Sequence, residues 1–143
     1  MENANKLPRK YVPKSLTKKD AEKQSSDIKR TALKVKEKKP LKKEDFERPK
    51  VDYPYKRSPY VKQFEDKYNM KVSIDGISEK FNIPKTALKQ IYDKGVGAFL
   101  SSGSRPNVNA YQWGFARIAS VLLGGKSRKI DNHIVEKYNI PLL

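Results

Sequence analysis

Apolar residues recur at helical spacing only in the second, larger part of the chain. They return every three or four positions in four stretches, which are residues 58–69, 75–95, 109–123 and 130–140. The alternation that a β-hairpin requires is not found. The pattern therefore predicts a mainly α-helical protein, with four or five short helices packed as a small domain over residues 58–143.

The first part of the chain has no such pattern. Residues 1–57 show no sustained period and are interrupted by five prolines, so they bury too little apolar surface to offset the entropy of ordering. Thr17 followed by Asp20 resembles a capping box and predicts one short helix. We therefore expect an extended basic N-terminal arm with at most one or two short helices. Two interpretations remain: a disordered tail, or an arm that threads between other subunits.

Residues 77–92, "ISEKFNIPKTALKQIY", have the spacing of a helix-turn-helix unit. Asn82 stands at the turn, where a left-handed backbone is required and Asn is tolerated. Pro84 suits the first turn of a second helix. The inward face of that helix is predicted to hold Ala87, Leu88 and Ile91. The whole stretch resembles the bihelical unit of many bacterial repressors.

A DNA-binding helix of this kind places its exposed side chains in the major groove. Lysine and glutamine can contact base edges or phosphates there. Two short helices joined by a tight turn are also a common scaffold in small α-helical domains, so DNA binding and pure support both remain open. The exposed positions of the second helix are predicted to be Lys85, Thr86, Lys89 and Gln90.

A loop rich in turn formers, "SSGSRPN", spans residues 101–107. It departs from the phosphate-binding Walker motif, because Arg-Pro stands where Lys-Ser is required and Pro106 removes a backbone donor. We interpret the loop as a rigid corner and expect no nucleotide hydrolysis. The residues assigned to this structural loop are Gly95, Gly97, Ser101, Ser102, Gly103, Ser104, Arg105, Pro106 and Asn107.

Individual positions of this corner have expected roles. Gly95 and Gly97 are expected to end the preceding helix, and Asn107 or Asn109 to cap the next one. Arg105 is expected to clamp loop carbonyls or helix C-termini, with an exposed phosphate contact as the alternative.

Charge sets the class of partner. The chain has 32 Lys/Arg against 16 Asp/Glu, a net charge of +16, which favours nucleic acid, an anionic membrane or an acidic protein surface. Besides the helix positions above, a basic run after Gly125 is a candidate anion contact. We expect it to lie at a helix C-terminus, where the dipole favours cations. Its members are Lys126, Arg128 and Lys129.

Several classes of function are disfavoured. The chain has no cysteine and a single histidine, His133, which excludes disulfide scaffolds and Cys- or His-rich metal sites. No apolar run approaches the length of a membrane span, and the N-terminus lacks the apolar core of a signal peptide. No catalytic arrangement is readable, so we expect no enzyme, no cofactor and no small-molecule substrate. Trp113 is expected in the core.

Four segments carry a resemblance: "YVPKSLTKKDAEKQ" (11–24), "GVGAFLSSGSRPN" (95–107), "WGFARIASVLLGG" (113–125) and "RKIDNHI" (128–134). Together they resemble a small basic domain of unknown function that recurs in nucleocytoplasmic large DNA viruses and some large phages. Each segment alone is weak, and the ordered combination is specific. The resemblance implies a protein of a large DNA virus and a place in its virion. It implies no catalytic residues.

Two functions from different classes follow as expectations. The first is a structural virion component, a minor capsid protein made in the host cytoplasm or virus factory, whose basic arm threads along other capsid proteins or the genome. The second is a DNA-binding protein, either a helix-turn-helix regulator or a packaged genome-condensing factor with non-specific contacts. The aromatic cluster at 51–60 favours the first. The side chains expected to anchor the arm on a partner are Tyr11, Val12, Leu16, Phe46, Tyr53 and Tyr55.

Overall fold

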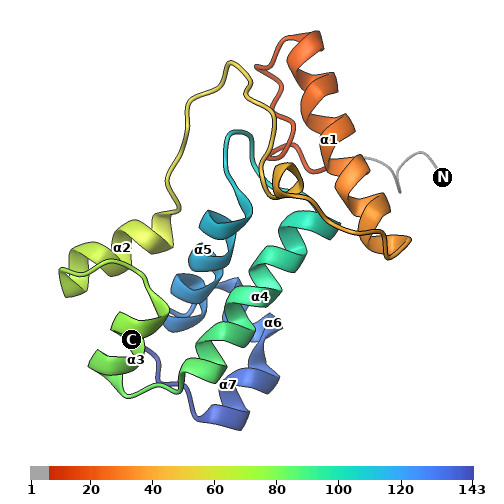
Figure 1. Cartoon of the computed structure of the whole chain (residues 1–143). Coiled ribbons are helices and arrows are strands. Elements are labelled where there is room, and N and C mark those ends of the chain that lie inside the picture. Colours follow the sequence, from red (N-terminus) through yellow and green to blue (C-terminus); the bar gives the residue numbers. More distant parts are fainter. Residues whose placement is uncertain (1–6) are drawn as a thin grey trace. The chain divides into compact units, whose positions relative to one another are not determined.

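The computed structural model describes residues 7–143 and is mainly α-helical (Figure 1). No β-strand occurs in that range; Glu47 and Asn109 form one isolated antiparallel bridge. The predicted α-helical class is therefore confirmed. The helices are α1 (Lys18–Lys36), the 3-10 helix η2 (Lys43–Phe46), α2 (Pro59–Tyr68), α3 (Ile74–Phe81), α4 (Lys85–Ser101), α5 (Ala110–Leu122), α6 (Lys126–Ile130) and α7 (Asn132–Tyr138).

The chain divides into two compact units. The first consists of the described residues up to Tyr55 together with Gly97–Ala110, and the second consists of Lys56–Val96 and Tyr111–Leu143. The boundary expected at residue 57 thus lies close to the first division. The loop that follows α4 was expected in the second domain and instead belongs to the first unit.

The first unit is built around α1, which differs from the extended arm expected here. Thr17 caps the helix, since its side chain accepts a hydrogen bond from the backbone N–H of Asp20 at 3.1 Å. The helix then continues for 19 residues, where the sequence suggested only a short one. Gln24, Ile28 and Thr31 form its buried face, at the spacing of one helix stripe.

The partners of that buried face come from far along the chain, which explains the difference. Residues 97–110 supply the buried apolar side chains Phe99, Leu100 and Val108. Gly103 has a φ of 109°, and a Cβ there would lie 2.9 Å from a methyl carbon of Ile28, so only glycine fits. Because this distant loop supplies much of the surface that covers α1, the sequence of residues 1–57 alone does not show how the helix is buried.

The second unit has an apolar core of its own, to which α2, α3, α4, α5 and α7 all contribute. Three core residues were predicted on the inward face of α4, and all three are fully buried. The core residues are Phe64, Val72, Ile77, Ile83, Ala87, Leu88, Ile91, Ile118, Ala119, Val121, Leu122, Ile134, Val135 and Ile140.

A tight turn joins α3 to α4. Asn82 follows the last residue of α3 and has φ 56° and ψ 41°, the left-handed backbone predicted for it. α4 begins three residues later at Lys85.

Gly95 on α4 and Gly114 on α5 bring these two helices close together in the second unit. A Cβ on Gly95 would lie 2.7 Å from the Cα of Gly114, whereas a Cβ on Gly97 would meet nothing within 4 Å. Both Gly95 and Gly97 lie inside α4, which runs on to Ser101. The expectation that they end the helix is therefore wrong. Gly95 allows α4 and α5 to pack closely. At Gly97 the space is open, so packing does not require glycine there.

Trp113 also differs from expectation, because it is only partly buried. The buried stripe of α5 runs through Gly114, Ile118 and Val121, and Trp113 lies about 100° away from Gly114 around the helix axis. α6 begins directly after Gly125. The basic run 126–129 therefore forms most of a short helix of its own. Lys126 starts this helix, where the dipole does not favour a cation, whereas Arg128 and Lys129 lie in its last turn.

Candidate functional site

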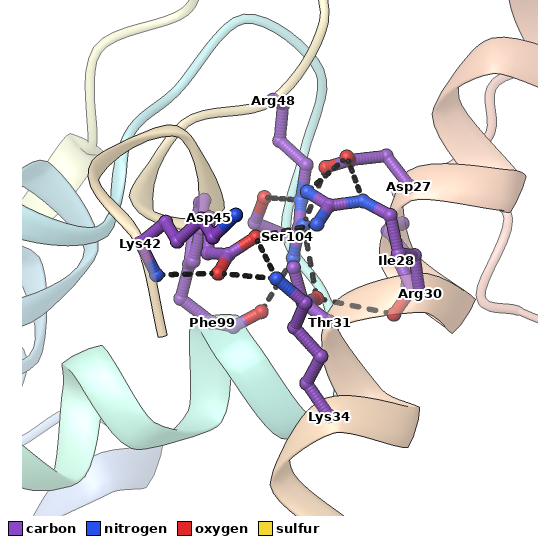
Figure 2. A network of polar contacts seen from close by, with 10 residues as sticks. All are labelled: Asp27, Ile28, Arg30, Thr31, Lys34, Lys42, Asp45, Arg48, Phe99 and Ser104. Carbon is purple, nitrogen blue, oxygen red and sulfur yellow. Dashed lines mark hydrogen bonds and ion pairs between the residues drawn. The ribbon is translucent and has the colours of Figure 1, made fainter. Parts of the chain in front are cut away.

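The most developed polar arrangement in the described chain is a buried network in the first unit, centred on Arg48 (Figure 2). The Arg48 side chain is fully buried. Its Nη1 donates to Oδ2 of Asp27 at 2.9 Å and to the hydroxyl of Thr31 at 3.3 Å. Asp27 and Thr31 both lie on α1, one turn apart, so Arg48 fixes the segment after η2 against that helix.

The other side of the Arg48 guanidinium holds the end of α4 and the loop after it. Its Nη2 donates to the carbonyl oxygen of Phe99, and its Nε donates to the hydroxyl of Ser104 at 3.1 Å. Burial lowers the pKa of the Arg48 guanidinium, while the hydrogen bond with Asp27 opposes that shift. One planar cation therefore joins three segments that are distant in sequence.

A second centre of the network is Asp45, whose side chain is fully buried. It receives hydrogen bonds from the backbone N–H of Lys42 at 2.7 Å and from Nζ of Lys34 at 2.9 Å, and it pairs with Arg30. Burial by itself raises the pKa of the Asp45 carboxyl, but these hydrogen bonds outweigh it and hold the pKa well below its usual value. Asp45 thus fastens η2 to the last turns of α1.

The clamp expected at Arg105 is made by Arg48 instead. Within residues 7–143, no hydrogen bond or ion pair of the Arg105 guanidinium is found, and the side chain is partly exposed. Its guanidinium opposes the effect of burial, which raises the pKa of the Tyr11 phenol. The loop does form a corner, but the clamp reaches it from residue 48 and not from within it.

Asn107 also takes a different role from the one expected. Its side chain accepts from the backbone N–H of Val51 at 3.1 Å and donates to the carbonyl oxygens of Val51 and Tyr53, at 3.1 and 2.7 Å. These bonds join the loop to the chain after η2, and they leave no side-chain cap from Asn107 on α5. Asn107 has a φ of 61°, a conformation that Asn tolerates.

Sequence reasoning missed Arg48, Asp27 and Asp45. Residues 7–55 contain 13 lysines but only three arginines, Arg9, Arg30 and Arg48. Two of these arginines lie in the network, which agrees with the preference for arginine in buried ion pairs. The rarity of arginine among many lysines was the one local signal available.

The six expected partner anchors are mostly turned towards the first unit itself. Leu16 is buried, and Tyr55 is the one clearly exposed member, with 51% of its surface accessible. The other four, Tyr11, Val12, Phe46 and Tyr53, are partly buried. The structure therefore assigns Leu16 to the unit's own packing and leaves Tyr55 on the surface.

The candidate contacts on α4 lie at the start of the helix in the second unit. Lys85 and Thr86 are exposed, and Lys85 pairs with Asp75 at 3.2 Å. Lys89 is exposed and pairs with Asp93 at 2.7 Å. Gln90 is partly buried and donates to the hydroxyl of Tyr138 at 3.0 Å. These side chains share one region, and three of the four have partners within the chain.

The candidates after Gly125 separate into two kinds. Lys126 and Lys129 are exposed. Arg128 donates to the carbonyl oxygens of Val121 at 3.0 Å and Ile140 at 2.7 Å, so it ties the C-terminal residues to the end of α5. Arg128 therefore has a structural role in the second unit.

Other kinds of site are not found in the part of the chain that the structure describes. No group of three or more His, Cys, Asp or Glu side chains is arranged to hold a metal ion there. None of the helices within residues 7–143 has the length and apolar character needed to cross a bilayer.

Comparison with known proteins places the chain in a family. No curated protein and no solved structure matches it. One family model does match, and it covers residues 20–137, which include most of each unit and the whole Arg48 network. The chain belongs to the family of unknown function DUF5824.

Proposed function

We propose that the protein is a structural component of the virion of a large DNA virus, a minor capsid protein whose basic first unit binds acidic surfaces of other capsid proteins. The viral setting is supported by the resemblance of residues 11–24, 95–107, 113–125 and 128–134 to a domain of large DNA viruses and phages. Synthesis in the host cytoplasm or virus factory and location in the virion follow from the same proposal.

The observation that carries the proposal is the charge distribution of the first unit. Residues 7–55 and 97–110 contain 17 Lys/Arg and 8 Asp/Glu. Three of these cations and two of the acids are paired with one another in the buried network. They are Arg30, Lys34 and Arg48 with Asp27 and Asp45. The remaining 14 cations stand against 6 acids, and 13 of those cations are exposed. Such a surface attracts a partner of opposite charge.

The form of the contact differs from a threading arm. Since α1 and the loop after α4 pack together, the binding element in this proposal is the folded surface of the first unit. The network of Arg48 and Asp45 keeps that surface in one conformation, which lowers the entropy cost of binding.

The test is fractionation of virions purified from the virus that encodes the chain. Virions are opened, treated with nuclease and sedimented, and the chain is followed by quantitative mass spectrometry. The proposal expects the chain to sediment with the capsid proteins after the genome has been digested. Release of the chain together with the digested genome would favour a genome-bound role, and absence from purified virions would overturn the proposal.

A second candidate is DNA binding through the start of α4. The left-handed turn at Asn82 and the exposed Lys85 and Lys89 on the following helix favour it. Each phosphate contact adds about one unit to the slope of log affinity against log salt. The double variant Lys85→Ala, Lys89→Ala should therefore flatten the salt dependence of duplex DNA binding by about two units. The equally charged control Lys62→Ala, Lys71→Ala, at exposed positions of the same unit, should leave that slope unchanged if this candidate holds.

A further inference from the structure

Apolar and basic side chains are exposed together where α1 ends. Seven large hydrophobic residues are exposed within residues 7–143, and three of them, Leu33, Val35 and Leu41, fall within residues 33–43. Their exposed fractions are 51%, 39% and 39%. The same 33–43 segment contains six lysines and one acid, Glu37. All of these lysines except Lys34 are exposed.

The 33–43 segment is held in a defined conformation. The N–H of Lys38 donates to the carbonyl of Val35 at 3.1 Å, and the N–H of Lys39 donates to the carbonyl of Lys34 at 2.9 Å. These two bonds form a Schellman motif, which reverses the chain directly after the helix. Beyond the turn, Asp45 draws the backbone of Lys42 and the side chain of Lys34 together. The two arms of the segment are thus fastened to one buried carboxylate.

Lys38 occupies a position that glycine normally takes. It has a φ of 55°, and the other non-glycine residues with positive φ among those described are all asparagines: Asn69, Asn82, Asn107 and Asn139. Asparagine tolerates this backbone, whereas lysine loses stability there. A lysine at this position is consistent with a role for its charge in binding, because the backbone itself would favour glycine or asparagine.

We propose that the 33–43 segment is a docking surface for an acidic, leucine-bearing segment of a partner protein. This proposal rests on the proposed function, because it names the chemistry of the capsid partner. The lysines match carboxylates of the partner. Leu33, Val35 and Leu41 match its apolar side chains, and their burial would supply the anchoring that rim charges alone do not give.

The observations favour a protein partner over nucleic acid or lipid. Phosphate binding needs cations and hydrogen-bond donors and gives three exposed aliphatic side chains no apolar surface to cover them. A membrane surface takes up one continuous apolar face of a helix. Leu33 and Val35 lie two positions apart on α1, about 200° around its axis, so a flat lipid surface cannot cover both. A protein partner can contact both sides of the helix end.

The test uses the full chain and two synthetic peptides of equal length and charge, one of Glu-Glu-Leu repeats and one of Glu-Glu-Ser repeats. Binding is measured by fluorescence anisotropy. The proposal predicts that the leucine peptide binds about tenfold more tightly. The variant Leu33→Ser, Leu41→Ser should remove this preference. Because both leucines are exposed, the variant should fold normally, which circular dichroism checks.

Leu142 offers a matched control, since 65% of its surface is exposed in the second unit. Leu142→Ser should keep the full preference for the leucine peptide. Equal affinity for the two peptides, or an equal loss of preference in Leu142→Ser, would overturn the proposal. Tighter binding to phosphatidylserine vesicles or duplex DNA than to the leucine peptide would overturn it too. Virion fractionation is a separate measurement, so failure of the peptide preference leaves the capsid assignment standing. Absence of the chain from virions would remove a capsid protein as the partner, whatever the peptide result.

Discussion

The guanidinium of Arg48 binds Phe99 in two ways at once. Its Nη2 donates to the Phe99 carbonyl oxygen, and its Cζ lies 4.0 Å from the centroid of the Phe99 ring. The hydrogen bond satisfies one of the carbonyls left open near the end of α4, and the stacking adds a cation–π contribution. This pair joins two parts of the first unit that are 51 residues apart.

Replacing Arg48 should test how much the network contributes to folding. Arg48→Met leaves Asp27 and the Phe99 carbonyl without their buried partner, and we expect the free energy of unfolding to fall by about 3–5 kcal/mol. Arg48→Lys keeps the charge but loses the planar fork, with an expected loss of about 2 kcal/mol. Urea denaturation measures both.

Arg105→Met is the matched control for this series. Its guanidinium has no hydrogen bond or ion pair within the described chain, so we expect a loss below about 1 kcal/mol. A larger loss in Arg105→Met than in Arg48→Met would contradict the assignment of the clamp to Arg48.

Asp45 predicts a specific pH dependence of stability. Because its pKa in the folded protein lies below the ordinary value of 3.8, its contribution is fully present above that pH and is lost as the pH falls further. Asp45→Asn should cost about 2–4 kcal/mol at neutral pH and should remove the part of the acid-induced loss that this group causes. Thermal unfolding between neutral and acidic pH measures this. The neighbouring Glu44 is exposed, and Glu44→Gln should change the free energy of unfolding at neutral pH by less than about 0.5 kcal/mol. An acid-induced loss in Asp45→Asn as large as in the wild type would count against a depressed pKa of Asp45.

Lys38 predicts a stabilising substitution. Because its backbone is left-handed, with a φ of 55°, Lys38→Gly should raise the free energy of unfolding by about 1 kcal/mol. Lys29 is exposed in the interior of α1, so Lys29→Gly should lower it by about 1 kcal/mol. Urea denaturation measures the free energy of unfolding of both variants. Each variant loses one lysine charge, so a difference between them reports the backbone conformation at the two positions. A destabilised Lys38→Gly would be inconsistent with the turn described here.

The two glycines of α4 should respond to alanine with opposite signs. Gly95→Ala places a Cβ 2.7 Å from the Cα of Gly114, and the forced separation of α4 and α5 should cost about 1–3 kcal/mol. At Gly97 the space is open, so Gly97→Ala should gain about 0.5–1 kcal/mol from helix propensity. The change in melting temperature reports both. A loss of stability in Gly97→Ala would mean that α4 does not continue through this position.

Features set by neighbouring residues could be predicted from the sequence. Thr17 with Asp20 marked the start of α1, and Asn82 marked the left-handed turn between α3 and α4, because both signals lie within a few residues of the structure they determine. Ala87 and Leu88 were placed on a buried helix face by spacing alone. The α-helical class follows from the same local patterns.

Features that depend on distant residues could not be predicted. Arg48 binds Asp27, which is 21 residues away in the sequence, and Phe99, which is 51 residues away. No sequence pattern around residue 48 indicates either partner. The buried face of α1 contacts the loop near Ser104, whose carbonyl oxygen accepts a hydrogen bond from the Gln24 side chain, 80 residues earlier. The N-terminal segment was predicted to be an arm from its composition alone, whereas residues 97–110 supply the surface that covers α1.

The measurement that tests the capsid proposal most directly is carbodiimide cross-linking of intact virions followed by mass spectrometry. Carbodiimide joins lysine amines to carboxylates in direct contact, the pairing that the proposal requires. We predict cross-links from Lys36, Lys38 and Lys43 to Asp or Glu residues of a capsid protein. Virions that contain the chain but yield only cross-links within it, or virions from which the chain is absent, would contradict the account.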